Sequence, residues 1–168
     1  KSLGYGTNYR LKFFKVIKQV LNQAHGRNLH DNRIPQTSPN WRFPEEKPDM
    51  IYLKEDDLDR IAILSLDDNL RVIRDFVIMM AYTGLRFEDF MTLTKDNLEE
   101  HRGKLQIRKV QSKTKNLVVI PIKPIVKDLI DKYDGFPPRV SNQYFNRRIK
   151  TVCQLAGVKE WEKVTAHT

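Results

Sequence analysis

Two short runs rich in β-branched and apolar residues, 105–110 and 117–120, constrain the fold of this 168-residue chain more than any other feature. Six residues, 111–116, mostly polar, separate the two runs, which is the pattern of two strands joined by a turn. Elsewhere the apolar residues recur at helical spacing. We therefore expect a mainly α-helical protein with a small β-hairpin or sheet.

Helices are expected on both sides of this hairpin. Thr7 is expected to cap a helix that runs to about Ala24, and Asn69 a helix that ends at Thr83 and Gly84. Gly84 suits a C-terminal turn that requires a positive φ. The remaining helices are expected from residue 51 with acids in the first turn, around 87–93, from Pro124 to about Tyr133, and from a cap at Ser141 to about Gly157.

The pattern divides the chain into three parts. Residues 1–30 read as the terminal helix of a domain whose remainder precedes it, with an apolar face made by Phe13, Ile17, Val20, Leu21 and Ala24. Residues 31–50 are rich in Asn, Pro and Arg and have no periodicity, which is typical of a linker. Residues 51–168 form the regularly patterned part.

Composition excludes several classes of protein. Hydrophobic residues make up 40% of the chain, yet no apolar run approaches the length of a membrane span. The single cysteine, Cys153, excludes an internal disulfide, and the four histidines are too scattered to form a metal site. We expect a soluble intracellular protein without a metal, a cofactor or a membrane partner.

The net charge of +9 is distributed in blocks. Residues 1–42 hold eight Lys and Arg against one acid, 43–103 hold eight against fifteen, and 104–150 hold twelve against three. Two basic blocks that flank an acidic one favour a polyanionic partner, most simply a nucleic acid, although a solvated basic surface is the alternative. The candidate DNA-binding residues are Arg10, Lys12, Lys15, Lys18, Lys115, Arg147 and Arg148.

Three positions could carry chemistry: Arg86, Lys113 and His167, although a histidine near the end of a chain carries almost no information by itself. Arg86 follows a tight turn at the end of an apolar helix, where it is expected to be rigid, partly out of solvent and suited to binding a phosphate. An ion pair with Glu88, Asp89 or a more distant acid is the alternative. Lys113, in the hairpin turn, could enter a DNA groove and donate a proton, or could simply discourage edge-to-edge pairing of the sheet.

These residues occur in an order that resembles the tyrosine recombinase (phage integrase) family. Residues 83–90, TGLRFEDF, fit that family's first box, T-G-[LM]-R-x-x-E/D-[LF]. Lys113 then precedes Ile-Pro-Ile at 120–122, as a hairpin lysine does in the family, and His167 matches the first residue of its H-x-x-R motif. The resemblance covers about residues 50–168, and residues 1–30 resemble the end of the family's core-binding domain, which binds DNA.

The resemblance implies a catalytic-domain fold that is incomplete at its C-terminus. Arg86 would stabilise charge on the phosphate, Lys113 would act as the general acid, with Lys115 as the second choice, and His167 would bind a non-bridging oxygen. Asp89 would support Arg86 or the surrounding fold. The family's second arginine and its nucleophilic tyrosine are expected to be missing, because all six tyrosines precede His167.

The implied function is site-specific recombination. An intact relative cuts and rejoins DNA through a 3′-phosphotyrosyl intermediate, without a metal or cofactor, to integrate or excise a mobile element. Its partners would be double-stranded DNA and other recombinase protomers, in the bacterial cytoplasm at the nucleoid, and this fragment would be inactive. The alternatives are a DNA-binding module without chemistry and a type IB topoisomerase-like enzyme.

Overall fold

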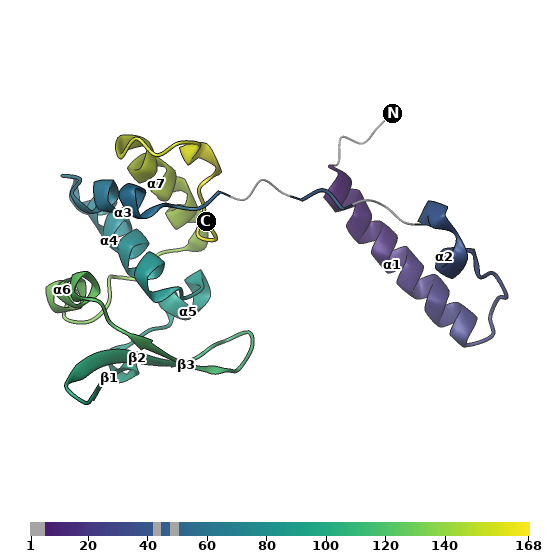
Figure 1. Cartoon of the computed structure of the whole chain (residues 1–168), viewed down its shortest axis with the longest axis horizontal. Coiled ribbons are helices and arrows are strands. Elements are labelled where there is room, and N and C mark those ends of the chain that lie inside the picture. Colours follow the sequence, from purple (N-terminus) through teal and green to yellow (C-terminus); the bar gives the residue numbers. More distant parts are fainter. Residues whose placement is uncertain (1–5, 42–44, 48–50) are drawn as a thin grey trace. The chain divides into compact units, whose positions relative to one another are not determined.

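The computed structural model describes residues 6–41, 45–47 and 51–168 (Figure 1). Within it the chain forms two compact units, which divide between residues 49 and 50. Each unit has its own internal packing and is described separately below.

The first unit is built on the helix α1, Thr7–Gly26. Gly6, with φ −63° and ψ 157°, occupies the N-cap position and offers no side chain to the helix. The predicted cap at Thr7 is therefore wrong, because Thr7 already has helical geometry and Arg10 donates its backbone N–H to the carbonyl of Gly6 at 3.1 Å. The helix itself extends two residues beyond the predicted end.

Much of the predicted linker folds back on α1. It contains the short helices α2, Ile34–Thr37, and η1, Pro39–Trp41. The ring of Trp41 lies 5.1 Å from the ring of Phe14, and Gln36 Nε2 donates to Asn22 Oδ1 at 2.9 Å. The predicted linker is thus partly ordered against the helix, through an aromatic and a polar contact that periodicity does not reveal. Residues 42–44 and 48–50 lie outside the described residues.

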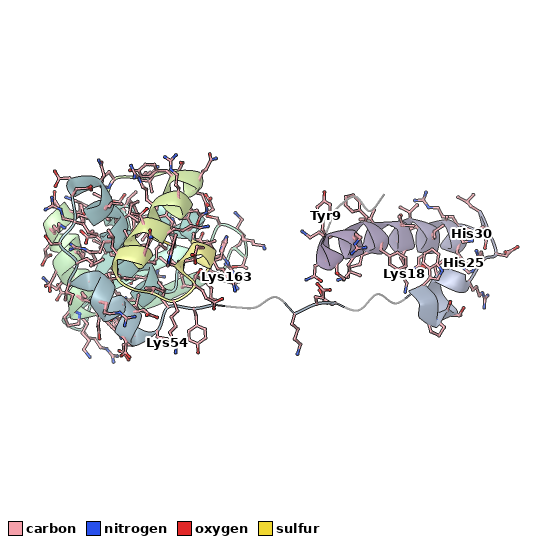
Figure 2. All side chains as sticks on the ribbon, turned by 90° about the horizontal axis from the view of Figure 1, so that it is seen from above. Tyr9, Lys18, His25, His30, Lys54 and Lys163 are labelled. Atoms are coloured by element: carbon pink, nitrogen blue, oxygen red, sulfur yellow. The ribbon has the colours of Figure 1, made fainter. Side chains whose placement is uncertain are left out.

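Two histidines lie together at the C-terminal end of α1 (Figure 2). The ring of His30 lies 5.7 Å from that of His25, its Nε2 lies 3.0 Å from the carbonyl oxygen of Leu21, and its Nδ1 accepts the backbone N–H of Asn32. These contacts fasten the chain that follows α1 to the last turns of the helix.

The apolar face predicted on α1 points away from this packing. Phe13, Ile17 and Val20 are 56%, 51% and 58% exposed, whereas Leu11 is the buried apolar residue of the helix. Tyr9 and Val16 extend the exposed face. Within the described part of the first unit, the residues that follow α1 therefore cover the opposite side of the helix.

The second unit places α4, Asp68–Thr83, at its centre. This helix contacts α3, Glu55–Ala62, α6, Pro124–Tyr133, and α7, Asn142–Leu155. Three buried rings, Phe76, Phe90 and Phe145, meet at the core, with centroids 5.5 and 6.1 Å from that of Phe76. The remaining helical elements are α5, Phe87–Met91, η2, Lys95–Asn97, and η3, Trp161–Lys163.

The ends of these helices test the expected caps. Asp67, and not Asn69, caps α4, because its Oδ1 accepts the backbone N–H of Leu70 at 2.9 Å. Gly84 ends α4 with φ +64°, as predicted, and Ser141 Oγ accepts the N–H of Tyr144 at 3.2 Å, as predicted for a cap of α7. The error at α4 arises because three polar residues in a row, 67–69, can each serve as a cap.

The small sheet has three antiparallel strands in the order β1, Leu98–His101, β2, Lys104–Val110, and β3, Leu117–Pro121. Ile107 is opposite both Leu98 and Ile120 and is fully buried, so this face of the sheet meets the core. The predicted hairpin is confirmed, and β1 is an additional strand. Its sequence, LEEH, has no alternating apolar residues to mark it.

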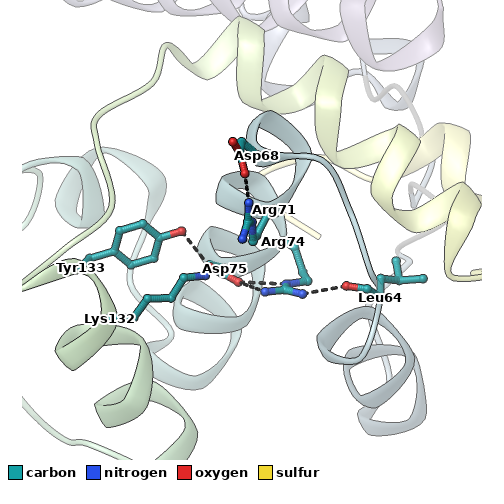
Figure 3. A network of polar contacts seen from close by, with 7 residues as sticks. All are labelled: Leu64, Asp68, Arg71, Arg74, Asp75, Lys132 and Tyr133. Atoms are coloured by element: carbon teal, nitrogen blue, oxygen red, sulfur yellow. Dashed lines mark hydrogen bonds and ion pairs between the residues drawn. The ribbon is translucent and has the colours of Figure 1, made fainter.

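A buried carboxylate joins α4 to α6 (Figure 3). Asp75, 1% exposed, accepts hydrogen bonds from Lys132 Nζ at 2.5 Å, Tyr133 Oη at 2.7 Å and Arg74 Nε at 2.9 Å. Arg74 also donates to the carbonyl oxygen of Leu64 at 2.7 Å, in the segment between α3 and α4. Two adjacent side chains on α4 thus hold the neighbouring elements: Asp75 holds α6, and Arg74 holds the loop before α4. The helix α6 follows directly from the hairpin.

Candidate functional site

Arg86 stands between α4 and α5. It is the N-cap residue of α5, and its neighbours Leu85 and Phe87 are 5% and 3% exposed, which anchors the backbone on both sides. Its side chain is exposed, so the expected partial burial is wrong. Among the described residues no carboxylate forms an ion pair with Arg86, and its guanidinium is therefore available to an external anion.

His167 and Arg86 line the same pocket, which has a volume of about 380 Å³. Gly84 and residues 165–168 contribute polar backbone or side chains, and the apolar part includes Val77, Met80, Leu85, Phe145 and Ile149. The fold thus brings the end of α4 and the last residues of the chain to one concave surface. This surface presents the guanidinium of Arg86 and the imidazole of His167 together with apolar side chains.

The turn that carries His167 is held by a set of short hydrogen bonds. Thr168 Oγ1 accepts the N–H of Thr165 at 2.7 Å, and Thr165 Oγ1 accepts the N–H of His167 at 3.2 Å. Ala166 donates its N–H to Asn146 Oδ1 of α7 at 2.7 Å. The imidazole of His167 is exposed at the end of this turn.

Asp89 connects the helix that follows Arg86 to the turn between β2 and β3. Its carboxylate is 1% exposed, and its Oδ1 accepts the backbone N–H of Ser112 at 2.7 Å. This hydrogen bond is the main cause of a lowered pKa for Asp89, which burial opposes and the positive charge of Arg86 reinforces. The buried carboxylate therefore remains charged and ties the base of the turn to α5.

Lys113 and Lys115 lie in this turn with exposed side chains. Gln111 N–H donates to the carbonyl of Asn116 at 2.9 Å and Lys115 N–H to the carbonyl of Gln111 at 3.0 Å, which closes the turn. Lys115 has φ +58°, whereas Lys113 directly follows the residue held by Asp89. In Figure 1 this turn and the C-terminus lie on the same side of the second unit, with α5 between them.

Asp89→Ala is predicted to loosen the turn that carries Lys113. The substitution leaves the Ser112 N–H without its acceptor, so the amides of residues 111–116 should exchange faster with solvent, and the unit should lose about 1–3 kcal/mol of stability. Because the pKa of Asp89 is lowered, its contribution is complete above the ordinary carboxyl pKa and is lost as the pH falls through the folded-state value.

Hydrogen exchange followed by mass spectrometry at neutral pH is the measurement for Asp89→Ala. The exposed neighbour Glu88→Ala, which removes the same charge from the same short helix, is the matched control and should leave the turn unchanged. Equal exchange in the two variants would contradict the assigned role of Asp89.

The remaining candidate DNA-binding residues lie on two helices that contain no acid, α1 and α7. On α7, Arg147 is exposed and Arg148 half-buried, and their guanidinium carbons lie 5.8 and 5.5 Å from the ring centroid of Tyr144. On α1, Arg10 and Lys12 are exposed, Lys18 is half-buried, and Lys15 Nζ lies 3.6 Å from Glu45 Oε1. Lys15 is thus partly neutralised within its own unit.

The tyrosines differ in their surroundings. Tyr133 donates its hydroxyl to Asp75, and burial together with this hydrogen bond raises its pKa. Lys123 Nζ lies 4.5 Å above the ring centroid of Tyr82. Tyr52 is 71% exposed and lines the pocket with Arg86 and His167, a placement that the sequence did not indicate because nothing in its local pattern distinguishes it.

The described part of the chain has neither a membrane-spanning helix nor a cluster of metal ligands. No helix there is both long and apolar enough to cross a membrane, and no three His, Cys, Asp or Glu side chains there gather as metal ligands. Cys153 is fully buried, and burial raises the pKa of its thiol to about 12, so the thiol stays protonated.

Comparisons with family models and with curated proteins give no match. Among solved structures, the XerH site-specific recombinase bound to its difH substrate in a pre-cleavage complex superposes with a TM-score of 0.54 at 16% identity. An integrase from mycobacterium phage Brujita superposes with a TM-score of 0.52 at 14% identity. The aligned regions cover 67% and 98% of this chain, respectively.

The chain spans only part of either neighbour, 37% of the XerH chain and 56% of the phage integrase chain. At these identities the similarity concerns the fold. The mainly helical architecture of this chain and its small antiparallel sheet match the catalytic-domain-like fold of these neighbours. The expected fold class is confirmed: this chain has a fold of the tyrosine recombinase type.

Proposed function

We propose that this chain is part of a site-specific DNA recombinase that binds duplex DNA through the surface around Arg86, Lys113 and His167. The observation that carries the proposal is the shared pocket of Arg86 and His167 within a recombinase-like fold. The hydrogen bond between Asp89 and Ser112 adds support, because it links the Lys113 turn to the helix that begins after Arg86.

Each side chain has a separate role at the same phosphodiester. The planar fork of Arg86 binds two phosphate oxygens and stabilises the charge that develops on them, and His167 donates a hydrogen bond to a non-bridging oxygen. A tyrosine hydroxyl attacks the phosphorus and releases its proton to solvent, the bond to the 5′-oxygen breaks, and Lys113 gives a proton to that oxygen. The broken ester is replaced by a phosphotyrosyl ester, so no cofactor is required.

The full reaction is proposed for the intact protein and also requires a second arginine and a tyrosine nucleophile. Its purpose would be integration or excision of a mobile element, with several protomers assembled on DNA at the nucleoid. A strand-exchange assay between two DNA sites tests this function. Relaxation of supercoils without exchange would instead indicate topoisomerase-like activity, and binding without cleavage would indicate a DNA-binding module.

DNA binding by this chain is predicted to weaken steeply as salt increases. Lys and Arg side chains that neutralise phosphates release condensed counterions, so the logarithm of the binding constant should fall linearly with that of the salt concentration. Titration of a labelled duplex, followed by fluorescence anisotropy at several salt concentrations, measures the slope. An affinity that does not change with salt would contradict the proposed phosphate contacts.

Arg147→Ala provides the residue-level test of the same prediction. Loss of one phosphate contact should lower the magnitude of the slope by about one. Arg139→Ala removes the same charge from an exposed loop position that lines a different pocket, with Phe136 and Pro137, and should leave the slope unchanged.

A further inference from the structure

We infer that Asn146 is a positioning residue that fixes the turn carrying His167 to α7. The inference rests on the proposed function only for its consequence in DNA binding, because the hold on the turn is a separate physical property. Asn146 is half-buried on α7, and its Oδ1 accepts the backbone N–H of Ala166 at 2.7 Å.

The amide of Asn146 has one orientation that satisfies both of its contacts. Its Nδ2 donates to Asn142 Oδ1, one helical turn earlier, which directs Oδ1 toward Ala166. Reversing the amide would bring two oxygens together at Asn142 and two donors together at Ala166. The backbone N–H of Ala166 can only donate, so this contact selects the orientation in which Asn146 Oδ1 accepts, and Asn142 Oδ1 then accepts from Asn146 Nδ2.

One such bond can set the position of the whole turn, because the turn is internally braced. The N–H of Thr165 donates to Thr168 Oγ1, and the N–H of Thr168 donates to the carbonyl oxygen of Thr165. Thr165 Oγ1 also accepts the N–H of His167. Val164, 1% exposed, anchors the chain just before the turn. The bond to Asn146 is then a second fixed point, beyond Val164, and it determines where the exposed imidazole is presented.

The position of the imidazole matters because the pocket is assembled from distant segments. Arg86 comes from the end of α4, whereas His167 comes from the turn held on α7. Two groups bind one phosphate well only when their separation is set before the phosphate arrives. Asn146 acts through the backbone of the turn and not by direct contact with Arg86 or the proposed phosphate.

Amide hydrogen exchange of the whole chain, measured by NMR, tests the positioning role without DNA. Asn146→Leu keeps a similar size and removes the acceptor, and we expect about tenfold faster exchange at Ala166, the effect of losing one hydrogen bond. Asn146→Asp keeps an acceptor, and Asn142 can turn its amide to donate to it, so exchange should stay near that of the unmodified protein. Gln143→Leu, at an exposed position of the same helix, is the control.

A second variant protects the test against general unfolding of α7. Ala166→Pro removes the donor without altering the helix, and Pro is accommodated after a residue that caps as Thr165 does. Exchange at Thr168 should rise in this variant, and adding Asn146→Leu should raise it no further. The inference would be overturned if exchange at Ala166 were unchanged in Asn146→Leu, or if Asn146→Asp accelerated that exchange as much as Asn146→Leu does.

A double-mutant cycle on DNA affinity tests the consequence. Asn146→Leu should weaken binding of a short duplex severalfold in the unmodified protein and have no further effect in a His167→Ala background. If Asn146→Leu weakens binding equally in both backgrounds, Asn146 does not act through His167. If His167→Ala itself leaves binding unchanged, the proposed role of His167 fails, and the exchange results still decide whether Asn146 positions the turn.

Discussion

Arg86→Ala is expected to reduce the rate of DNA cleavage by the intact recombinase by about 10²–10³-fold while leaving the fold unchanged. The rate falls because the guanidinium would no longer stabilise the charge that develops on the phosphate. The fold persists because Arg86 is exposed and no described carboxylate pairs with it, while Leu85 and Phe87 hold the backbone in the core. Single-turnover cleavage of a suicide substrate measures the rate, and thermal unfolding measures the stability.

Two further arginine variants sharpen this test. Arg86→Lys keeps the charge and loses the bidentate fork, so its rate should lie between those of Arg86→Ala and the unmodified protein. Arg139→Ala, at an exposed loop position that lines a separate pocket, should leave both the rate and the stability unchanged. If Arg86→Ala instead lowers the melting temperature by several degrees, Arg86 has a structural role that the observed contacts do not reveal.

Asp75→Ala is expected to destabilise the second unit by about 3 kcal/mol, the largest stability effect anticipated for a polar residue of this chain. It would leave the Tyr133 hydroxyl and the Arg74 guanidinium without their shared acceptor in a buried position (Figure 3). The value lies at the low end for a broken buried pair because Lys132 is 38% exposed and can be hydrated again. Urea unfolding measures it, and Asp128→Ala, exposed on α6, should change stability by less than about 0.5 kcal/mol.

The stabilisation from Asp75 should also depend on pH. Burial would raise the pKa of Asp75, but hydrogen bonds from Lys132, Tyr133 and Arg74 together lower it below the ordinary value. A carboxyl group with a lowered pKa stabilises the fold fully above its unfolded-state pKa, near 4, and loses this contribution as the pH falls through the folded-state value. The stability difference between the unmodified protein and Asp75→Asn should therefore shrink below about pH 4. A difference that stays constant down to pH 3 or below would contradict the observed network.

The sequence predicted several helix ends correctly, each at a residue with a strong preference for that position. Pro124 begins α6, Ser141 caps α7, and Gly84 ends α4, as their sequence contexts indicated. The β1 strand escaped prediction because its pairing with β2 is determined by the partner strand and the tight turn at Arg102 and Gly103, both with positive φ. Local patterns are thus informative about helix ends and weak on strands that a neighbour stabilises.

The sequence named the residues of the candidate site but did not indicate how they are arranged. Motif order singled out Arg86, Lys113 and His167, and their catalytic roles stay predictions. The contacts that support them join distant positions: Asp89 with Ser112, and Asn146 with Ala166. Neither pair has a sequence signature, because backbone N–H groups that donate such hydrogen bonds are the same at every residue except proline.

The exposure of Arg86 was misjudged, and what lies against the apolar face of α1 could not be predicted, for a related reason. Periodicity shows which residues share a face of a helix, and it does not show what lies against that face. Phe13, Ile17 and Val20 do share one face of α1, yet the residues that follow the helix pack on its other side. For Arg86, a position after a tight turn at the end of an apolar helix suggested partial burial, yet its side chain is exposed between the buried residues Leu85 and Phe87.

The most direct test of the proposed DNA surface is a titration of this chain with a short duplex at low salt, followed by backbone amide NMR. The largest chemical-shift changes are expected to cluster at residues 84–89, 111–116 and 165–168, around Arg86, Lys113 and His167. The loop at 134–139, which lines a separate pocket, should change little. Changes concentrated at that loop, or none at the three segments while the duplex is bound, would contradict the assignment of this surface to DNA.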